Sequence, residues 1–140
     1  MPDPSAVPHL HFDANAILRY LRNDIPAQAH AVQLRLIEAQ AGRLVIEIHP
    51  LVLAEVLFVL KSNYSSPRER SASTLLTFLD TPGIRIPEER RIREALERYR
   101  DHNVSFIDAF LATLGAETSQ PIFSFDRGLD KFKDIRRVEK

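Results

Sequence analysis

The segment that decides the fold is HLHFDANAIL, residues 9–18. His9–Phe12 has the length of a short strand and ends at a polar residue, and Ala14–Arg22 carries a short helical pattern. Asp13 stands between the two. A strand that passes directly into a helix is the unit from which parallel sheets are built, so we expect an α/β fold that continues outward from this segment.

The rest of the chain repeats this alternation of short apolar runs and helical patterns. Further strands are predicted at Leu44–His49, Ile84–Ile86, Ile122–Phe125 and Arg136–Val138. Further helices are predicted at Ala27–Ala41, Val52–Lys61, Arg68–Leu79, Glu88–Arg100 and Ser105–Leu114, with Gly115 as the stop of the last one. Because strands alternate with helices, we expect a three-layer α/β/α fold around a small, mostly parallel central sheet of four or five strands.

Length and composition are those of a compact globular protein. A chain of 140 residues fits one domain, since domains typically hold roughly 100–150 residues. We therefore expect a single domain over residues 1–140, with the proline-containing residues 1–8 as an extended lead-in. At 44% hydrophobic and 27% charged residues, wholesale disorder is excluded. The absence of cysteine excludes disulfides, thiolate zinc sites and thiol nucleophiles.

The overall charge bears on the partners that the chain can meet. Lys+Arg and Asp+Glu both number 19, so the formal net charge is zero and a nucleic acid would have to meet a local patch. No apolar run approaches the ~18–20 residues of a membrane span. The first residues also lack the charged-then-apolar pattern of a secretion signal. We therefore expect a cytoplasmic protein without a membrane segment.

Two acidic residues directly follow predicted strands. Asp13 follows His9–Phe12, and Asp126 follows Ile122–Phe125. In parallel sheets the carboxyl ends of the strands form the edge at which ligands bind. Each acid could equally cap the helix that comes next, which for Asp126 is a short helix at Arg127–Phe132, because Asp is a favoured N-cap. Both interpretations stay open from the sequence.

Two more acidic residues fall inside apolar helical segments. Glu55 is the only charged residue in Leu51–Leu60, a segment that is apolar nearly all round, so we expect it to be buried. A buried carboxylate must be paired, protonated or metal-bound, and a buried ion pair with a distant arginine or a cavity-facing kink is the alternative to a functional role. Asp108 lies three residues after Ser105, the spacing of a capping box, and is either a helix-start residue or a ligand.

Taken together, these acids predict a metal site. If Asp13, Glu55, Asp108 and Asp126 converge on one pocket, their mutual repulsion must be neutralised. An oxygen-rich cluster without His or Cys suits Mg²⁺ or Mn²⁺, ions that polarise phosphate oxygens and activate water. Ser124 lies two residues before Asp126, where its hydroxyl could orient a carboxylate or a water molecule. The pattern favours hydrolysis of phosphodiester bonds.

The same segments resemble the PIN-domain family. Residues 9–18 resemble the opening strand of that family, whose final Asp is followed two residues on by Asn or Ser. LAEVL (residues 53–57) resembles its helix with a buried Glu, VSFIDAFLA (104–112) its third acidic motif, and FSFDR (123–127) its fourth. The likeness runs over essentially the whole chain in order and spacing. The size and layout resemble the VapC-type toxins of bacterial and archaeal toxin–antitoxin pairs.

This resemblance implies a PIN-like Mg²⁺- or Mn²⁺-dependent endoribonuclease, with tRNA or rRNA as its target. It further implies a homodimer and inhibition by a small antitoxin protein encoded alongside. Matched by position, the catalytic and metal-binding acids would be Asp13, Glu55, Asp108 and Asp126, supported by Asn15 and Ser124. Asp13 and Asp108 would be the principal ligands of the ion.

The chain departs from the family pattern near the fourth acid. Many members carry a further Asp where this chain has Gly128, and Asp130 could take its place. The fourth acid is therefore either Asp126 or Asp130. A non-catalytic PIN-like binding or scaffold module with a degenerate metal site is the alternative function.

The remaining charged and aromatic side chains are expected to be structural. His9 and His11 share one face of a strand, but no third ligand has matching spacing, so we expect them at the surface or packed at the strand edge. Arginines and glutamates interleave over residues 85–100, which favours a solvated, salt-bridged helix face over an RNA patch. The aromatic side chains expected in the core are Phe58, Phe106 and Phe110.

Overall fold

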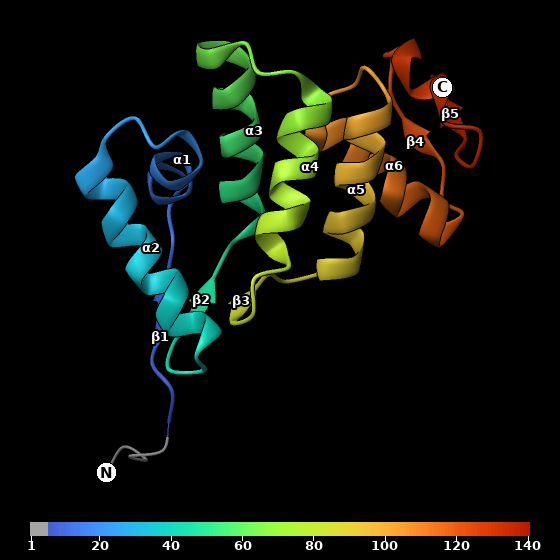
Figure 1. The fold of residues 1–140 in the computed structure, drawn as a ribbon. Helices are drawn as coiled ribbons and strands as arrows, with labels where there is room; N and C mark the ends of the chain where they lie inside the picture. The colour runs from blue at the N-terminus through green and yellow to red at the C-terminus, as the bar shows by residue number, and fades with distance from the viewer. Residues whose placement is uncertain (1–5) are drawn as a thin grey trace. The chain divides into compact units, whose positions relative to one another are not determined.

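The computed structural model describes residues 6–140, and within them every predicted helix and strand is present (Figure 1). The order is β1 (His9–His11), α1 (Ala14–Arg22), α2 (Pro26–Gln40), β2 (Val45–Glu47), α3 (Pro50–Tyr64), α4 (Arg68–Leu79), β3 (Ile84–Arg85), α5 (Glu89–Asp101), α6 (Phe106–Thr118), β4 (Ile122–Phe123), the 3-10 helix η1 (Arg127–Lys131) and β5 (Arg137–Val138). Of the expected lead-in over residues 1–8, residues 1–5 lie outside the described part, and residues 6–8 are exposed and irregular. Within residues 6–140, no helix has both the length and the apolar character that crossing a membrane requires.

The strands pair in parallel, which confirms the α/β class. They divide between two sheets, one of three strands in the order β1-β2-β3 and one formed by β4 and β5. In the first sheet Leu10 pairs with Ile46, and Ile46 with Ile84. In the second, Ile122 pairs with Arg137, and the N–H of Ile122 donates to the carbonyl of Arg136 at 2.8 Å. The five predicted strands are thus all paired, in sheets of three and two.

The chain forms two compact units that we describe separately. The first spans Met1–Val59, described from Ala6 onward, together with Thr77–Pro87, and the second spans Leu60–Leu76 and Glu88–Lys140. Helices α3 and α4 each contribute residues to both units.

The first unit is built around strand β2. Ile46, in the middle of this strand, is fully buried, as is Ile17 of α1. Helix α2 packs on α1, and its Ala39 lies against the turn that leads into β3. A Cβ atom on Gly83 of this turn would lie 2.6 Å from the carbonyl oxygen of Ala39, and its φ of +90° lies in the left-handed region. Only glycine fits this close contact between a helix end and a strand start.

The second unit is built around the packing of α5 on α6. Ile92 and Leu96 of α5 and Ala109 of α6 are fully buried. Contrary to prediction, α6 does not stop at Gly115 but continues to Thr118 and ends at Ser119, whose φ is 58°.

Gly115 has a packing role instead of a terminating one. It is buried, and a Cβ atom at this position would lie 3.0 Å from Cδ1 of Ile122 in β4. The glycine lets the helix approach the strand closely, and this explains why it lies inside the helix rather than after it.

Helix α3 is buried along one stripe only. Leu53, Val56 and Leu60, spaced three and four residues apart, are buried, whereas Leu51 is 73% and Phe58 is 70% exposed. The expectation that Phe58 belongs to the core, and that this helix is buried all round, is wrong. A helix presents successive residues at 100° intervals, so an apolar sequence does not by itself reveal how much of its circumference is covered.

Arg68 holds the turn between α5 and α6 in the second unit. Its Nη1 lies 2.7–3.0 Å from the carbonyl oxygens of Tyr99, His102 and Val104, and its Nη2 lies 3.0 Å from Oδ1 of Asn103. The guanidinium also lies 4.4 Å from the centre of the Tyr99 ring. Carbonyl groups at a helix C-terminus have no partner inside the helix, and one cation satisfies several of them here.

We expect Arg68→Met to lower the free energy of unfolding by about 1.5–3 kcal/mol, because carbonyls in a half-buried turn lose a charged donor. The exposed Arg70 on the same helix is the matched control, and Arg70→Met should change stability by less than about 0.5 kcal/mol. Urea unfolding of both variants measures the difference. Equal effects would show that Arg68 does not stabilise this turn.

Candidate functional site

Asp13 caps helix α1 at the carboxyl end of strand β1. Its Oδ1 accepts a hydrogen bond from the N–H of Ala16 at 2.8 Å, and its backbone is extended. The preceding residue, Phe12, donates its N–H to the carbonyl of Glu47 next to it in the sheet. The capping interpretation is confirmed. The side chain is exposed, and Oδ2 has no hydrogen-bond partner among residues 6–140.

Glu55 lies in the middle of α3 on its exposed face, so the prediction that it is buried is wrong. Its helical neighbours Leu51 and Phe58 are also exposed, which removes the apolar surroundings inferred from the sequence. Within the described part of the chain Glu55 forms no hydrogen bond or ion pair, so the alternative of a buried pair with arginine is also wrong. The carboxylate is free to bind a ligand. Asn15, in the first turn of α1, is likewise exposed.

Asp108 occupies the first turn of α6. Its N–H donates to Oγ of Ser105, the N-cap, at 3.1 Å. The return bond of a full capping box, from the Ser105 N–H to the Asp108 carboxylate, is absent between these two described residues. The half-exposed Asp108 carboxylate therefore forms no capping hydrogen bond with the N–H of Ser105. It stands in the first turn, where the helix N-terminus carries a partial positive charge.

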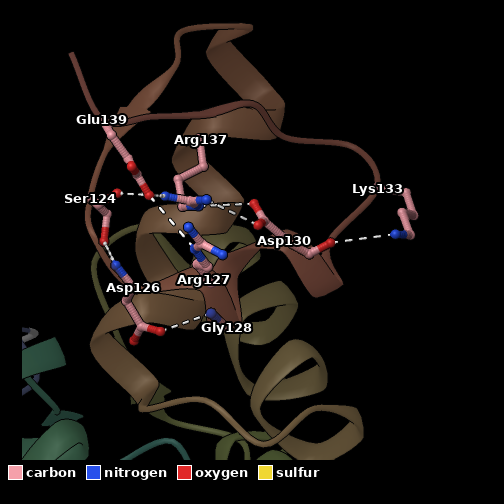
Figure 2. A network of polar contacts seen from close by, with 8 residues as sticks. All are labelled: Ser124, Asp126, Arg127, Gly128, Asp130, Lys133, Arg137 and Glu139. Atoms are coloured by element: carbon pink, nitrogen blue, oxygen red, sulfur yellow. Dashed lines mark hydrogen bonds and ion pairs between the residues drawn. The ribbon is translucent and has the colours of Figure 1, made fainter.

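Asp126 caps η1 through a compact turn that Figure 2 shows. Its N–H donates to Oγ of Ser124 at 3.0 Å, and its Oδ1 accepts from the N–H of Gly128 at 2.8 Å. The capping interpretation is confirmed here too. The Ser124 hydroxyl contacts the backbone of Asp126, so it fixes the turn that presents the exposed carboxylate.

Gly128 fits this turn because it has no side chain. A Cβ atom there would lie 2.9 Å from Oδ1 of Asp126 and would force one of the two to move. The position at which this chain departs from the expected family pattern is therefore one where Asp126, as oriented here, leaves no room for an acid.

The Asp130 carboxylate forms an ion pair with an arginine, whereas the Asp126 carboxylate does not form one within residues 6–140. Arg137 donates from Nε and Nη2 to both of its carboxylate oxygens, at 2.9 and 3.1 Å (Figure 2). The same guanidinium donates to the carbonyl of Ser124 at 3.0 Å and to Glu139 at 2.6 Å. Arg137 thereby holds the pKa of the Asp130 carboxyl below its ordinary value. Of the two candidates for the fourth acid, Asp126 has the available carboxylate.

Arg137 was not singled out from the sequence. Its partners Asp130 and Ser124 lie 7 and 13 residues away, outside the short spacings that reveal helical ion pairs. No local signal could have found it.

The other charged side chains are structural. The arginines of α5 form the expected exposed ion pairs, Arg93 with Glu89 at 3.3 Å on the same helix and Arg91 with Glu117 at 2.7 Å across to α6. His9 Nδ1 lies 2.9 Å from Glu47 Oε1. These contacts confirm the prediction of a salt-bridged helix face.

The structure assigns Asp13 and Glu55 to the first unit and Asp108 and Asp126 to the second. Within either unit taken by itself, residues 6–140 include no group of three or more His, Asp or Glu side chains arranged to hold a metal ion. Each unit thus contributes a pair of candidate acids.

We expect Arg137→Met to raise the pKa of Asp130 towards its ordinary value of 3.8, because the variant removes both donors to the carboxylate. A carboxylate with a lowered pKa stabilises the fold above its ordinary pKa, and this contribution is lost as the pH falls through the lowered value. The stability difference between wild type and variant should therefore narrow below pH 3.8.

Side-chain NMR titration measures this pKa directly. Asp134, whose pKa is lowered by Arg98, serves as the internal control and should not change in the variant. An unchanged Asp130 titration would mean that Arg137 does not hold this carboxylate in solution.

Two comparisons with known proteins give similarities. The family described as PIN domain matches residues 11–135, a stretch that contains all of the candidate acids. A protein from Pseudomonas aeruginosa named "Aspartate aminotransferase" is 29% identical over 84 residues, which are 60% of this chain and 21% of that protein. The chain thus spans about a fifth of the length of this relative.

Proposed function

The chain belongs to the PIN-domain family, and we propose that it is a divalent-metal-dependent endoribonuclease that hydrolyses phosphodiester bonds in RNA. Nuclease activity is the general activity of this family. One observation carries the proposal: the matched region contains four acids, Asp13, Glu55, Asp108 and Asp126, whose carboxylates are left available by the hydrogen bonds of residues 6–140.

The donor chemistry of these acids fits Mg²⁺ or Mn²⁺. Both ions prefer carboxylate oxygens, and no histidine is needed to complete such a site. Asp13 and Asp108 are the principal ligands in this proposal, and Glu55 and Asp126 complete the acidic site. When bound, the ion supplies Lewis-acid polarisation of a phosphate oxygen.

The hydrogen bonds of the chain orient these ligands. Asp13 and Asp126 each use one oxygen as a cap and keep the other for a ligand, so their side chains need no reordering on binding. Ser124 supports the Asp126 turn through its bond to the Asp126 N–H, and in this proposal Asn15, exposed in the first turn of α1, orients a ligand or a water molecule. The pairing of Asp130 with Arg137 favours Asp126 as the fourth acid.

The same proposal extends to the partners and the setting of the protein. We infer a cytoplasmic toxin of a toxin–antitoxin pair, acting on tRNA or rRNA, held inactive by a small antitoxin protein and assembled as a homodimer. A single nuclease domain over residues 1–140 is part of this proposal. Exposed apolar side chains support protein partners, since contiguous exposed apolar patches mark interaction sites. The first unit exposes Leu51 and Phe58 of α3, and the second unit exposes Ile107 and Leu111 of α6.

We expect Asp13→Asn, Asp108→Asn and Asp126→Asn each to lower Mg²⁺-stimulated RNA cleavage by more than about 100-fold. Removal of a residue that merely orients a metal ligand already costs 10–100-fold. Asn caps helices about as well as Asp, so the variants at 13 and 126 lose the charge but keep the cap and the fold. Cleavage of a labelled RNA, with circular dichroism to check folding, measures the effect.

Asp130→Asn is the matched control for Asp126→Asn, because the two acids lie in the same short segment. It should keep cleavage within a few-fold of wild type. Full activity of both Asp13→Asn and Asp108→Asn would remove the mechanism. If Asp130→Asn loses RNA cleavage while Asp126→Asn retains it, Asp130 rather than Asp126 is the fourth acid.

We expect Mn²⁺ to raise the thermal stability of the wild type and not of Asp108→Asn. An ion that binds only the folded state adds about 2.7 kcal/mol at 100 times its Kd. A thermal melt at increasing Mn²⁺ measures this without any RNA. If millimolar Mn²⁺ leaves the wild type unchanged, the non-catalytic scaffold becomes the better assignment.

A further inference from the structure

Two phenylalanines of the second unit lie on the surface immediately before Asp126. Phe123 is 62% exposed and Phe125 is 73% exposed, although both are large apolar side chains. Their rings contact each other, with centroids 5.4 Å apart and planes at 81°. A pair of rings at this angle offers two separate faces rather than one continuous surface, and it is held by its own edge-to-face contact.

Exposed cations lie close to this pair in the chain. Arg127 follows Phe125 by two residues, its side chain is 83% exposed, and it forms a long ion pair of 4.0 Å with Glu139 (Figure 2). Arg136, whose carbonyl is bonded to strand β4, is exposed and has no ion pair within residues 6–140. Both carboxylate oxygens of Asp130 accept hydrogen bonds from Arg137.

Two further contacts complete this charge balance. Asp134 is bound by Arg98, through bonds of 2.9 and 2.5 Å. Lys133 is exposed and contacts only the carbonyl of Asp130, at 3.5 Å, among the described residues. Of the charged groups that adjoin the two rings in the chain or on the paired strand, Arg127 and Arg136 are exposed cations and Asp126 is the available acid.

We propose that Phe123 and Phe125 form a stacking platform for unpaired bases of an RNA single strand; this inference rests on the proposed nuclease function. Exposed aromatic rings beside Arg and Lys are the combination by which proteins bind single-stranded nucleic acid, with the rings stacking on bases and the cations contacting phosphates. Paired bases inside a duplex cannot reach such rings. The platform therefore selects RNA that is single-stranded close to the bond being cleaved.

The position of the platform explains how it would serve cleavage. Phe125 is the residue directly before Asp126, and Ser124, which lies between the two Phe residues in the chain, accepts a hydrogen bond from the Asp126 N–H through its hydroxyl. A base that stacks on Phe125 or on Phe123 would thereby lie beside a residue one or three positions before a proposed ligand, Asp126. Binding energy from a base remote from the reacting bond would in this way orient the phosphate.

A tryptophan reporter tests the platform directly. The chain contains no tryptophan, so Phe125→Trp introduces a single one that keeps an aromatic face. We expect its fluorescence to be quenched in a saturable manner by single-stranded oligouridine of about 12 nucleotides, within the length range that one binding fold covers. The measurement is made in EDTA so that no cleavage occurs. A duplex of the same length should quench it far less.

Leucine variants separate base stacking from plain apolar contact. Phe123→Leu and Phe125→Leu keep an apolar side chain but lose the flat face, and each should raise the Kd for the oligouridine about 5- to 100-fold. Phe125→Tyr should bind within a few-fold of wild type. Phe58→Leu is the matched control, since Phe58 is equally exposed but lies in α3, and it should have no effect.

The outcomes distinguish this platform from the proposed function. Equal binding by wild type and both leucine variants overturns the platform, whether or not the protein cleaves RNA. Weakened binding by the variants supports the platform even if no metal restores cleavage, in which case the nuclease assignment fails alone. If leucine at these positions leaves RNA binding intact but abolishes self-association, the surface is a protein interface and the platform is wrong.

Discussion

The backbone N–H groups at the start of a helix have no acceptor within the helix, and two of the four candidate acids, Asp13 and Asp126, supply one with a carboxylate oxygen. Asp13 accepts from the first turn of α1 and Asp126 from the first turn of η1, while Asp108 lies in the first turn of α6. A cap needs only one carboxylate oxygen. The helix start therefore fixes the direction of the side chain and leaves the second oxygen available, so that a structural and a chemical role coexist in one residue.

The sequence predicted the order and the boundaries of nearly all elements because these depend on local signals. Prolines and polar residues end the strands, and an Asp after a strand marks the next helix, as Asp13 and Asp126 do. Where the prediction failed for Glu55 and Phe58, the helix was placed correctly and the burial of the side chains was not. Apolar neighbours could not reveal that Glu55 and Phe58 face solvent, because the sequence does not state which side of α3 is covered.

Two further features lay beyond any local signal. Gly115 was predicted to end α6, but it lies inside the helix and lets α6 approach Ile122 closely. The sequence alone does not distinguish a glycine that ends a helix from one that allows a close contact. Arg137 bonds to Asp130 and Ser124, which lie 7 and 13 residues away and which only the folded chain brings close, as well as to Glu139 two residues further on. Because Arg137 binds both carboxylate oxygens of Asp130, the preference for Asp126 as the proposed fourth acid rests on three-dimensional contacts.

The division of the chain has a consequence for how the protein can be dissected. The polypeptide passes from the first unit to the second after Val59, returns after Leu76, and passes over again after Pro87. No single cut of the polypeptide therefore separates the two units intact. A shortened chain that ends between Val59 and Pro87 would lack part of the first unit and part of the second. The last segment of the first unit, Thr77–Pro87, is therefore synthesised only after Leu60–Leu76 of the second unit.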